Sequence, residues 1–596
     1  MNHPSRRAGL FASLAIVLSI LPATAQKKAN KSAESTPNAV EPWDQPQPEH
    51  ETINIAMYQR IREEGIKNSR VMEYASGLMD GIGSRLTGSP NMHRANGWTR
   101  DQLTAMGCVN AHLEDWGEFG MGWQQLNTWV RMAAPDSQVM IAQAAPWSPS
   151  TNGAVQGAAI SVDIQKEEDL AKYKGQLAGK IVLLEKMREV PPVEKALFQR
   201  LDADELKKIY DYPLHKEPEV IDQIKDFLDA LTLRTKVGAF LAQEHAIAVI
   251  VPSRDGNDGG GSGGTVFDDF VSDMGLLINK REHANPLPIA VMAVENYGRI
   301  YRLLKANVPV ELEMNIQARF TGDHEHGFNT IAEIPGTDPN LKDQVVMVGG
   351  HLDSWAAGTG ATDNGAGSVV AMEVMRILNA LHVKPRRTIR IALWSGEEEG
   401  LLGSYGYVSQ HFGSYPLSNS PDQAELPALI RKIVGPLQVK PEQKLVSGYF
   451  NLDNGSGRIR GIYLQGNMAI ERIFRQWIEP LHDLGVTTVT VRNTSGTDHE
   501  SFDAIGIPGF QFIQDPLDYE SRTHHSNMDV YEELRPEDLA QAATVEAIFV
   551  YNAAMRDQML PRKPLPHPEL HDQQAEPLKG VMPGAVEKKE EKSEPK

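Results

Sequence analysis

Histidine and carboxylate side chains recur in several separated motifs in the second half of this 596-residue sequence. The candidates are His351, Asp353, Asp363, Glu397, Glu398, Asp453, Asp498, His524, His525 and Asp529. Imidazole nitrogens and carboxylate oxygens are ligands that zinc accepts. Cys108 is the only cysteine, so a thiolate cluster is excluded and a metal must be held by His, Asp and Glu. One such residue alone usually caps a helix or turn, but their joint placement predicts a metal site.

Most of these motifs follow segments that read as buried β-strands. Apolar runs predict strands at residues 345–348, 389–394, 446–452 and 507–513, and helical spacing predicts a helix at 369–381. This alternation indicates an α/β fold with a mixed, mainly parallel sheet flanked by helices. A closing helix is expected to start near Pro536. Ligands bind at the carboxyl ends of strands in such sheets, so the candidate side chains are expected to converge.

Length and composition divide the chain into parts, because 596 residues exceed one ordinary core. Residues 1–25 read as a signal peptide, with two arginines, an apolar run and a small-residue cleavage site. The polar composition of residues 26–48 and 561–596 predicts a disordered linker and a disordered tail. The formal charge of -19 argues against nucleic-acid binding. The protein is therefore expected to be exported, periplasmic or secreted, without stable membrane insertion after signal cleavage.

Between the two ends, a second domain is expected to interrupt the first. Residues 49–147 and 319–560 form the predicted discontinuous catalytic domain, and residues 148–318 form the insertion. Within the insertion, residues 193–231 read as a charged helical excursion. Residues 255–264 are rich in glycine, which predicts a mobile, exposed loop.

Taken in order, the motifs resemble the two-zinc exopeptidase family that includes bacterial leucine aminopeptidases, glutamate carboxypeptidase and carboxypeptidase Q. The resemblance covers roughly residues 68–551 and includes Ile82-Gly-Ser-Arg-Leu-Thr-Gly-Ser89 and Gly496-Thr-Asp498 besides the metal motifs. It implies the zinc exopeptidase fold, two Zn²⁺ ions and the hydrolysis of short peptides or dipeptides. Members often carry an inserted protease-associated domain, which the resemblance implies for residues 148–318. A homodimer is left open.

The resemblance also assigns roles to individual residues. It places His351 and Asp453 on one zinc ion, Glu398 and His525 on the other, and Asp363 between both. Glu397 then becomes the general base, since a carboxylate beside zinc-activated water can take its proton and pass it to the leaving amine.

Further groups are expected to support the metal ligands. Asp353 belongs to the catalytic apparatus as the group that orients His351, and Asp529 is expected to orient His525, because a metal-bound imidazole usually donates its other N–H group. Asp498 is a further candidate near the site. An exchange of roles between His524 and His525 stays open, and substrate-binding residues stay unknown. The resemblance also implies a cis peptide bond after Asp363.

Three questions remain open from the sequence. It does not decide between aminopeptidase, carboxypeptidase and dipeptidase action. A glutaminyl cyclase-like acyltransferase shares the fold but uses one zinc ion, and a binding ectodomain of the same fold would have lost ligands or base. The joint presence of His351, Asp453 and Glu397 favours two metals and hydrolysis. The insertion is hypothesised to cover the mouth of the site and restrict substrates to short peptides.

Overall fold

The computed structural model describes residues 41–565, except 212–219, 257–258, 269–279, 281–283, 421–422, 424–425, 427 and 429–430. The predicted signal peptide, most of the predicted linker and most of the predicted tail lie outside the described residues. Within the described part, every helix is too short or too polar to cross a membrane.

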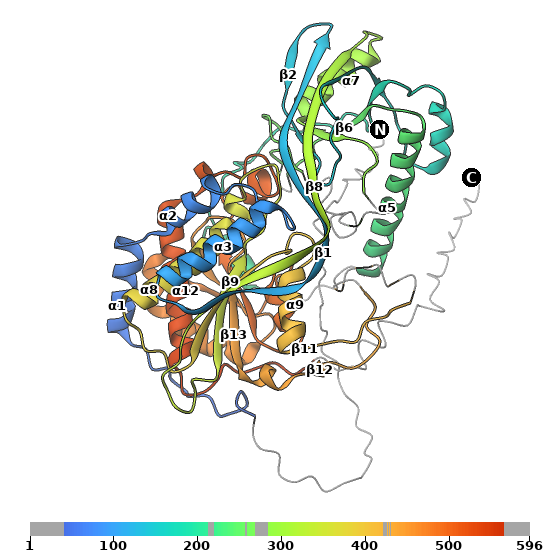
Figure 1. The fold of residues 1–596 in the computed structure, drawn as a ribbon. Helices are drawn as coiled ribbons and strands as arrows, with labels where there is room; N and C mark the ends of the chain where they lie inside the picture. Colours follow the sequence, from blue (N-terminus) through green and yellow to red (C-terminus); the bar gives the residue numbers. More distant parts are fainter. Residues whose placement is uncertain are drawn as a thin grey trace, which may run out of the picture.

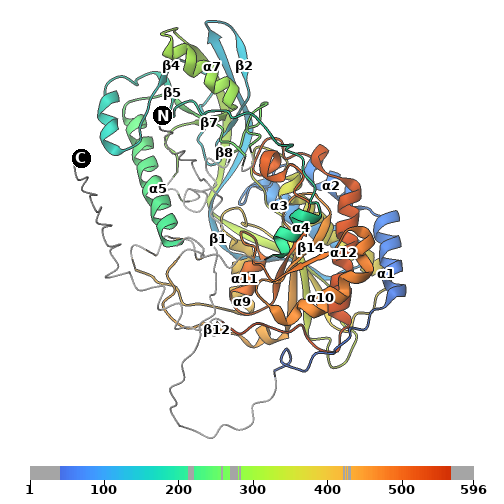
Figure 2. The same cartoon turned by 180° about the vertical axis from the view of Figure 1, so that it is seen from behind.

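A sheet of 14 strands runs through the molecule (Figures 1 and 2). One half of the sheet belongs mainly to the predicted catalytic domain, and we call it the catalytic half. Its strand order is β15-β14-β16-β13-β9-β10-β8. β9 pairs in parallel with β10 and β13, β13 pairs in parallel with β16, and β8 joins β10 in antiparallel fashion. The predicted mixed, mainly parallel sheet is confirmed. The bounds are β8 (Glu311–Ile334), β9 (Val345–His351), β10 (Thr388–Trp394), β13 (Val446–Asn451), β14 (Ile459–Tyr463), β15 (Thr488–Thr490) and β16 (Gly509–Gln514).

Helices cover both faces of this half. The main core contains α8 (Ala366–Ala380) and α12 (Pro536–Met555), which begins at the predicted Pro536. The same core includes side chains from α1 (Ile55–Arg62), α2 (Val71–Ala75), α3 (Pro90–Ala105) and α10 (Glu471–Ile478). A smaller aromatic core lies against α9 (Leu402–His411) and α11 (His499–Asp503), with Trp394 contacting Tyr407, Tyr449 and Phe502. Almost every residue of α8 is buried, including Glu373 and Arg376, which pair with each other.

Two long strands carry the sheet into a second hydrophobic core. β1 (Val109–Ala134) and β8 pair antiparallel along almost their whole length, and Figure 1 shows them rising together from the catalytic half. Beyond them the sheet continues through β4 (Val155–Ser161), β5 (Lys180–Leu183), β6 (Ala248–Pro252), β7 (Ile289–Met292) and β3 (Ala142–Ala144); β2 (Gln138–Met140) pairs with β1. α5 (Val220–Gln243) and α7 (Val294–Lys305) contribute to this second core. The predicted boundaries at 148 and 318 stay a prediction.

The helical prediction for residues 193–231 was wrong at its start. Residues 193–200 form no helix, and Gln199 instead makes an antiparallel bridge to Leu517 in the catalytic half. α4 (Ala203–Tyr210) follows and packs beside β15, where Thr490 Oγ1 donates to the Ile209 carbonyl at 2.9 Å. We call residues 199–210 the strap, because they cross from the second core onto the catalytic half.

The glycine-rich loop also differs from its prediction. Gly256 and Gly260 lie so close to the chain at Ser521 that a Cβ atom on either would stand 2.3 Å from the Ser521 carbonyl oxygen. Phe267, just after the loop, forms a bridge with Ser526. The expectation of an exposed loop was therefore wrong for most of its described residues. Glycine here permits close backbone approach.

Candidate active site

The predicted ligands converge at the carboxyl ends of the parallel strands. His351 is the last residue of β9, Glu397 and Glu398 follow β10, and Asp453 follows β13. Asp363 lies in η5 (Ala361–Gly365), and His525 comes from the loop after β16. All these side chains are buried or nearly so. The structure thus brings together residues from five separate segments.

Asp363 lies between two histidines. Its Oδ1 is 3.3 Å from His351 Nε2, and its Oδ2 is 3.2 Å from His525 Nε2. His351 Nε2 is also 3.4 Å from Asp453 Oδ1, while His525 Nε2 is 3.0 Å from Glu398 Oε2. The ligand atoms therefore form two adjoining groups that share one carboxylate. Among the described residues, three sets of three lie close enough to hold a metal ion: His351, Asp363 and Glu398; His351, Glu397 and Asp453; and Asp363, His524 and His525.

The chemistry of these atoms fits zinc. His351 Nε2, Asp363 Oδ2, Glu398 Oε1 and Asp453 Oδ1 are buried and have no hydrogen-bond partner among the described residues. Buried polar atoms without a partner are costly, and a coordinated cation satisfies them. A cavity of about 10 Å³ beside Asp363, Glu398 and His525 has room for about one small sphere. Zinc accepts this mixture of imidazole and carboxylate ligands.

Electrostatics binds the groups to one another. Burial alone would raise the pKa of Asp363, but the neighbouring imidazoles of His351, His525 and His524 outweigh it and hold that pKa well below its usual range. Burial likewise opposes the charged form of His351, yet Asp453 and Glu397 raise the pKa of His351 well above its usual value. The cluster therefore attracts positive charge.

Glu397 approaches the cluster without being one of the predicted ligands. Its Oε2 is 3.8 Å from His351 Nε2. Burial raises the pKa of Glu397 well above its ordinary value, and Asp453 and Asp498 add to this against the effect of His351. A nearby dication favours the charged carboxylate. A carboxylate in this place can exchange protons with a substrate or water.

Asp353 lies beside His351 as expected. His351 Nδ1 is 3.2 Å from the Asp353 carbonyl oxygen and 3.6 Å from its Oδ1. Asp353 Oδ2 accepts hydrogen bonds from the Glu398 N–H and from Thr87 Oγ1, both at 3.2 Å. One side chain thus contacts a predicted ligand from each group. The role of Thr87, within the early motif at residues 82–89, was not recognised from the sequence.

Arg85 comes from the same early motif and holds the loops around the site. Its guanidinium is fully buried and donates to the carbonyl oxygens of Leu352, Thr359 and Gly360. Burial lowers the pKa of Arg85 to about 10, although Asp529 and Asp353 favour the charged form. No sequence signal distinguished this use of Arg85 from a surface ion pair.

Asp529, which was expected to orient His525, contacts the segment that carries Asp363. Its Oδ1 accepts from the N–H of Thr362 at 2.6 Å and from Thr362 Oγ1 at 2.7 Å, and its Oδ2 accepts from the N–H of Asp363 at 3.1 Å. The described contacts of Asp529 therefore fix the segment that carries Asp363, because the backbone donors of η5 face this carboxylate. The Asp363–Asn364 bond is cis, as expected.

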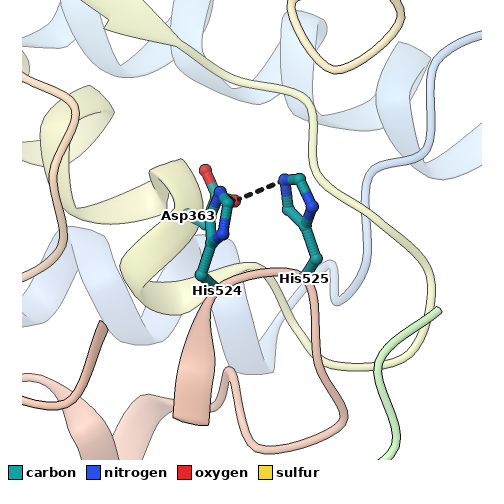
Figure 3. Close-up of side chains that lie close together, drawn as sticks. All are labelled: Asp363, His524 and His525. Atoms are coloured by element: carbon teal, nitrogen blue, oxygen red, sulfur yellow. Dashed lines mark ion pairs between the residues drawn. The ribbon is translucent and has the colours of Figure 1, made fainter. Parts of the chain in front are cut away.

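Two other predicted residues border the cluster. Asp498 is fully buried directly before α11, and burial raises its pKa to about 8. His524 stacks on His525 with ring centroids 3.7 Å apart, and its Nε2 is 3.6 Å from Asp363 Oδ2 (Figure 3). His525 makes the shorter contact to Asp363 and also contacts Glu398. The geometry favours His525 as the ligand.

The fold and the site together define a class of metal-dependent hydrolase, and comparison with known proteins agrees. Residues 329–550 match the model of peptidase family M28. Over this stretch the chain resembles the zinc exopeptidases of that family.

Named relatives narrow the resemblance. Human carboxypeptidase Q is 24% identical over 511 residues, which is 86% of this chain and 89% of that protein. Carboxypeptidase Q of Pongo abelii is 29% identical over 276 residues, 46% of this chain and 52% of that protein, so this match spans about half of its length. The structure of a peptidase M28 precursor from Shewanella amazonensis matches with a TM-score of 0.57 at 22% identity, covering 86% of this chain and 98% of that one. It shows the same fold.

Proposed function

We propose that this chain is an exported two-zinc exopeptidase that hydrolyses short peptides or dipeptides, with Glu397 as general base. The observation that carries the proposal is the position of Asp363, whose two oxygens face His351 and His525 at 3.3 and 3.2 Å. A carboxylate shared in this way supports two metal ions. It disfavours the one-zinc glutaminyl cyclase-like alternative, and the retained ligand set disfavours an inactive binding ectodomain.

The residues divide the work as follows. His351 and Asp453 would hold one zinc ion, Glu398 and His525 the other, and Asp363 both. When bound, zinc polarises the substrate carbonyl and acidifies water toward a pKa of ~7. Glu397 accepts the proton of the attacking water and returns it to the leaving amine. Asp353 and Asp529 hold His351 and Asp363 in place through their hydrogen bonds.

The second core supports a restriction on substrate length. Phe267 bridges to Ser526, next to the predicted ligand His525, so a segment of the proposed insertion borders the site. The strap reaches the catalytic half at Leu517, on the same loop after β16. Because these two segments border the site, we infer that they obstruct the binding of a long peptide. Such an obstruction is consistent with a lid over an exopeptidase site.

A panel of dipeptides tests the activity and its direction. Purified zinc-loaded protein would be given free, N-blocked and C-amidated dipeptides, and its zinc content would be measured by mass spectrometry. We expect two zinc ions per chain and hydrolysis of free dipeptides. Loss on N-blocking identifies an aminopeptidase, loss on amidation a carboxypeptidase, and loss on both a dipeptidase. Full zinc without turnover would contradict the proposal, as would one zinc ion with cyclisation of N-terminal glutamine.

Export and assembly belong to the same proposal. Cleavage after residue 25 is expected, and the mass of the mature protein recovered from the periplasm or medium would test it. The homodimer stays a prediction that light scattering can decide.

A further inference from the structure

A short segment of the proposed insertion is built into the loop that carries His525. The N–H of Asn527 donates to the Val266 carbonyl oxygen at 2.9 Å, and its Oδ1 accepts from the Val266 N–H at 2.7 Å. Asn527 Nδ2 also donates to the Gly264 carbonyl oxygen at 3.2 Å. Residues 264–268 thus lie along residues 525–527 like a short added strand, and we call them the clasp.

Asp268, at the end of the clasp, joins two loops of the catalytic site. Its N–H donates to the carbonyl oxygen of His525 at 3.0 Å. Its Oδ2 accepts from the N–H groups of Ala356 and Ala357, at 3.0 and 2.8 Å. These alanines follow Trp355, whose ring packs edge-on against the His525 ring with centroids 5.8 Å apart. Asp268 therefore holds His525 by its backbone and holds the loop that presses on its ring.

The backbone of His525 gives this contact its importance. His525 has a φ of 59°, in the left-handed region that residues other than glycine adopt uncommonly. The hydrogen bond from the Asp268 N–H fixes the carbonyl group of His525. The Asp268 carboxylate is fully buried, and two backbone N–H donors fix the position of its Oδ2. Burying a carboxyl group costs free energy unless hydrogen bonds compensate, so these bonds are needed for Asp268 to occupy this position.

We propose that Asp268 is a positioning residue for the metal site formed by Glu398 and His525, so that the proposed insertion completes the zinc centre structurally. This inference rests on the two-zinc function proposed above. It predicts that removing the Asp268 carboxylate loosens one metal site and leaves the site of His351 and Asp453 intact. The conservative amide should suffice, because both backbone donors bond to the same oxygen, which asparagine retains.

The test is a cobalt titration of metal-free protein, read by the visible absorption of bound Co²⁺, with Asp268→Ala and Asp268→Asn. In Asp268→Ala we expect one of two Co²⁺ ions to bind roughly 10- to 100-fold more weakly, with an altered spectrum, as for other groups that orient metal ligands. Asp268→Asn should keep the parent affinity and spectrum. Asp169→Ala is the matched control, since Asp169 is a buried carboxylate of the second core that accepts the Gln165 N–H at 3.0 Å, away from the clasp.

Asn527→Ala gives an independent variant should Asp268→Ala fold poorly. It removes the side-chain hydrogen bonds of Asn527 to Val266 and Gly264, so it should weaken the binding of the same metal ion. Parent-like binding of both ions by folded Asp268→Ala or Asn527→Ala would overturn the proposal. Equal damage from Asp268→Asn and Asp268→Ala would overturn it too, since the charge rather than the hydrogen bonds would then matter. If the parent itself bound one ion or none, the two-zinc function would fail first, which the same titration shows separately.

Discussion

Glu397 and Glu399 are neighbouring buried glutamates with different surroundings. Glu397 Oε2 lies 3.8 Å from His351 Nε2, whereas Glu399 is not among the groups that could hold a metal ion. Glu397→Gln keeps the shape and removes the proton acceptor, so we expect both metals to remain bound while kcat falls by about 10²- to 10⁴-fold. Steady-state kinetics with metal analysis checks this.

Glu399→Gln is the matched control for that variant. Burial raises the pKa of Glu399 well above its ordinary value, and the amide keeps the size and shape of this side chain. Metal-loaded Glu397→Gln that kept more than a few per cent of parent activity would exclude the general-base role.

Glu546 is a buried carboxyl group in the middle of α12, away from the proposed metal ligands. Neither carboxyl oxygen has a hydrogen-bond partner among the described residues, and burial raises its pKa well above the ordinary value. A raised folded-state pKa stabilises the fold below the unfolded pKa near 4.3 and loses that contribution as pH rises toward the folded pKa. Over that window this group alone lowers the free energy of unfolding by about 1.4 kcal/mol per pH unit.

Glu546→Met should therefore be more stable than the parent, by about 1–3 kcal/mol for removing an unsatisfied buried group. The advantage should grow from pH 5 to pH 8. Urea midpoints of the metal-free proteins at both pH values measure it. A difference that stayed constant or shrank with rising pH would show that Glu546 titrates normally.

Among the elements, the strap is joined to the catalytic half by Arg200 as well as by backbone contacts. Arg200 Nη1 lies 3.0 Å from Asp515 Oδ2 and 2.7 Å from Asp538 Oδ2, and both carboxylates are buried. Asp515 keeps Arg460, and Asp538 keeps Arg458, when Arg200 is removed. Arg200→Ala should therefore release the strap locally while the catalytic half stays folded.

Hydrogen exchange of the Gln199 and Leu201 amides measures that release, and we expect it to be at least several-fold faster in Arg200→Ala. Arg131→Ala is a suitable control, because its ion pair with Glu313 lies on β1 and β8 away from the strap. Unchanged exchange at Gln199 would show that the backbone bridge to Leu517 holds the strap without Arg200.

Elements with local signals were predictable from the sequence, whereas elements made by distant pairing were not. Apolar runs in the sequence predicted β9, β10, β13 and β16, and apolar residues at helical spacing predicted α8. The strap and the clasp were missed, because charged or glycine-rich residues take their conformation from partners far along the chain. The candidate residues His351, Glu398 and Asp453 could be singled out because each ends or follows a recognisable strand, whereas Asp363 and His525 were assigned through the family resemblance. Asp268 carries no comparable signal, since its partners are backbone groups.

For the whole molecule, the strap and the clasp place the second core beside the catalytic face. If this part acts as a lid, kcat/KM should fall as substrates lengthen from dipeptides to hexapeptides of one composition. Initial rates on an alanine series measure this preference. Hexapeptides cleaved as efficiently as dipeptides would show that the second core leaves the site open. Deleting residues 148–318 is a poorer test, because it also removes Asp268 from the metal site.

The pairing of β1 with β8 also governs the order in which the protein can acquire its structure. Arg131 and Glu313 face each other across this ladder although 182 positions separate them in the chain. During synthesis, β1 emerges long before β8 and stays unpaired until β8 follows. The apolar side chains of β1 that are buried in the folded protein are exposed to solvent during this time. Closing so long a loop is slow, and both hydrophobic cores contain residues of these two strands. The two halves are therefore expected to reach their final state together and late.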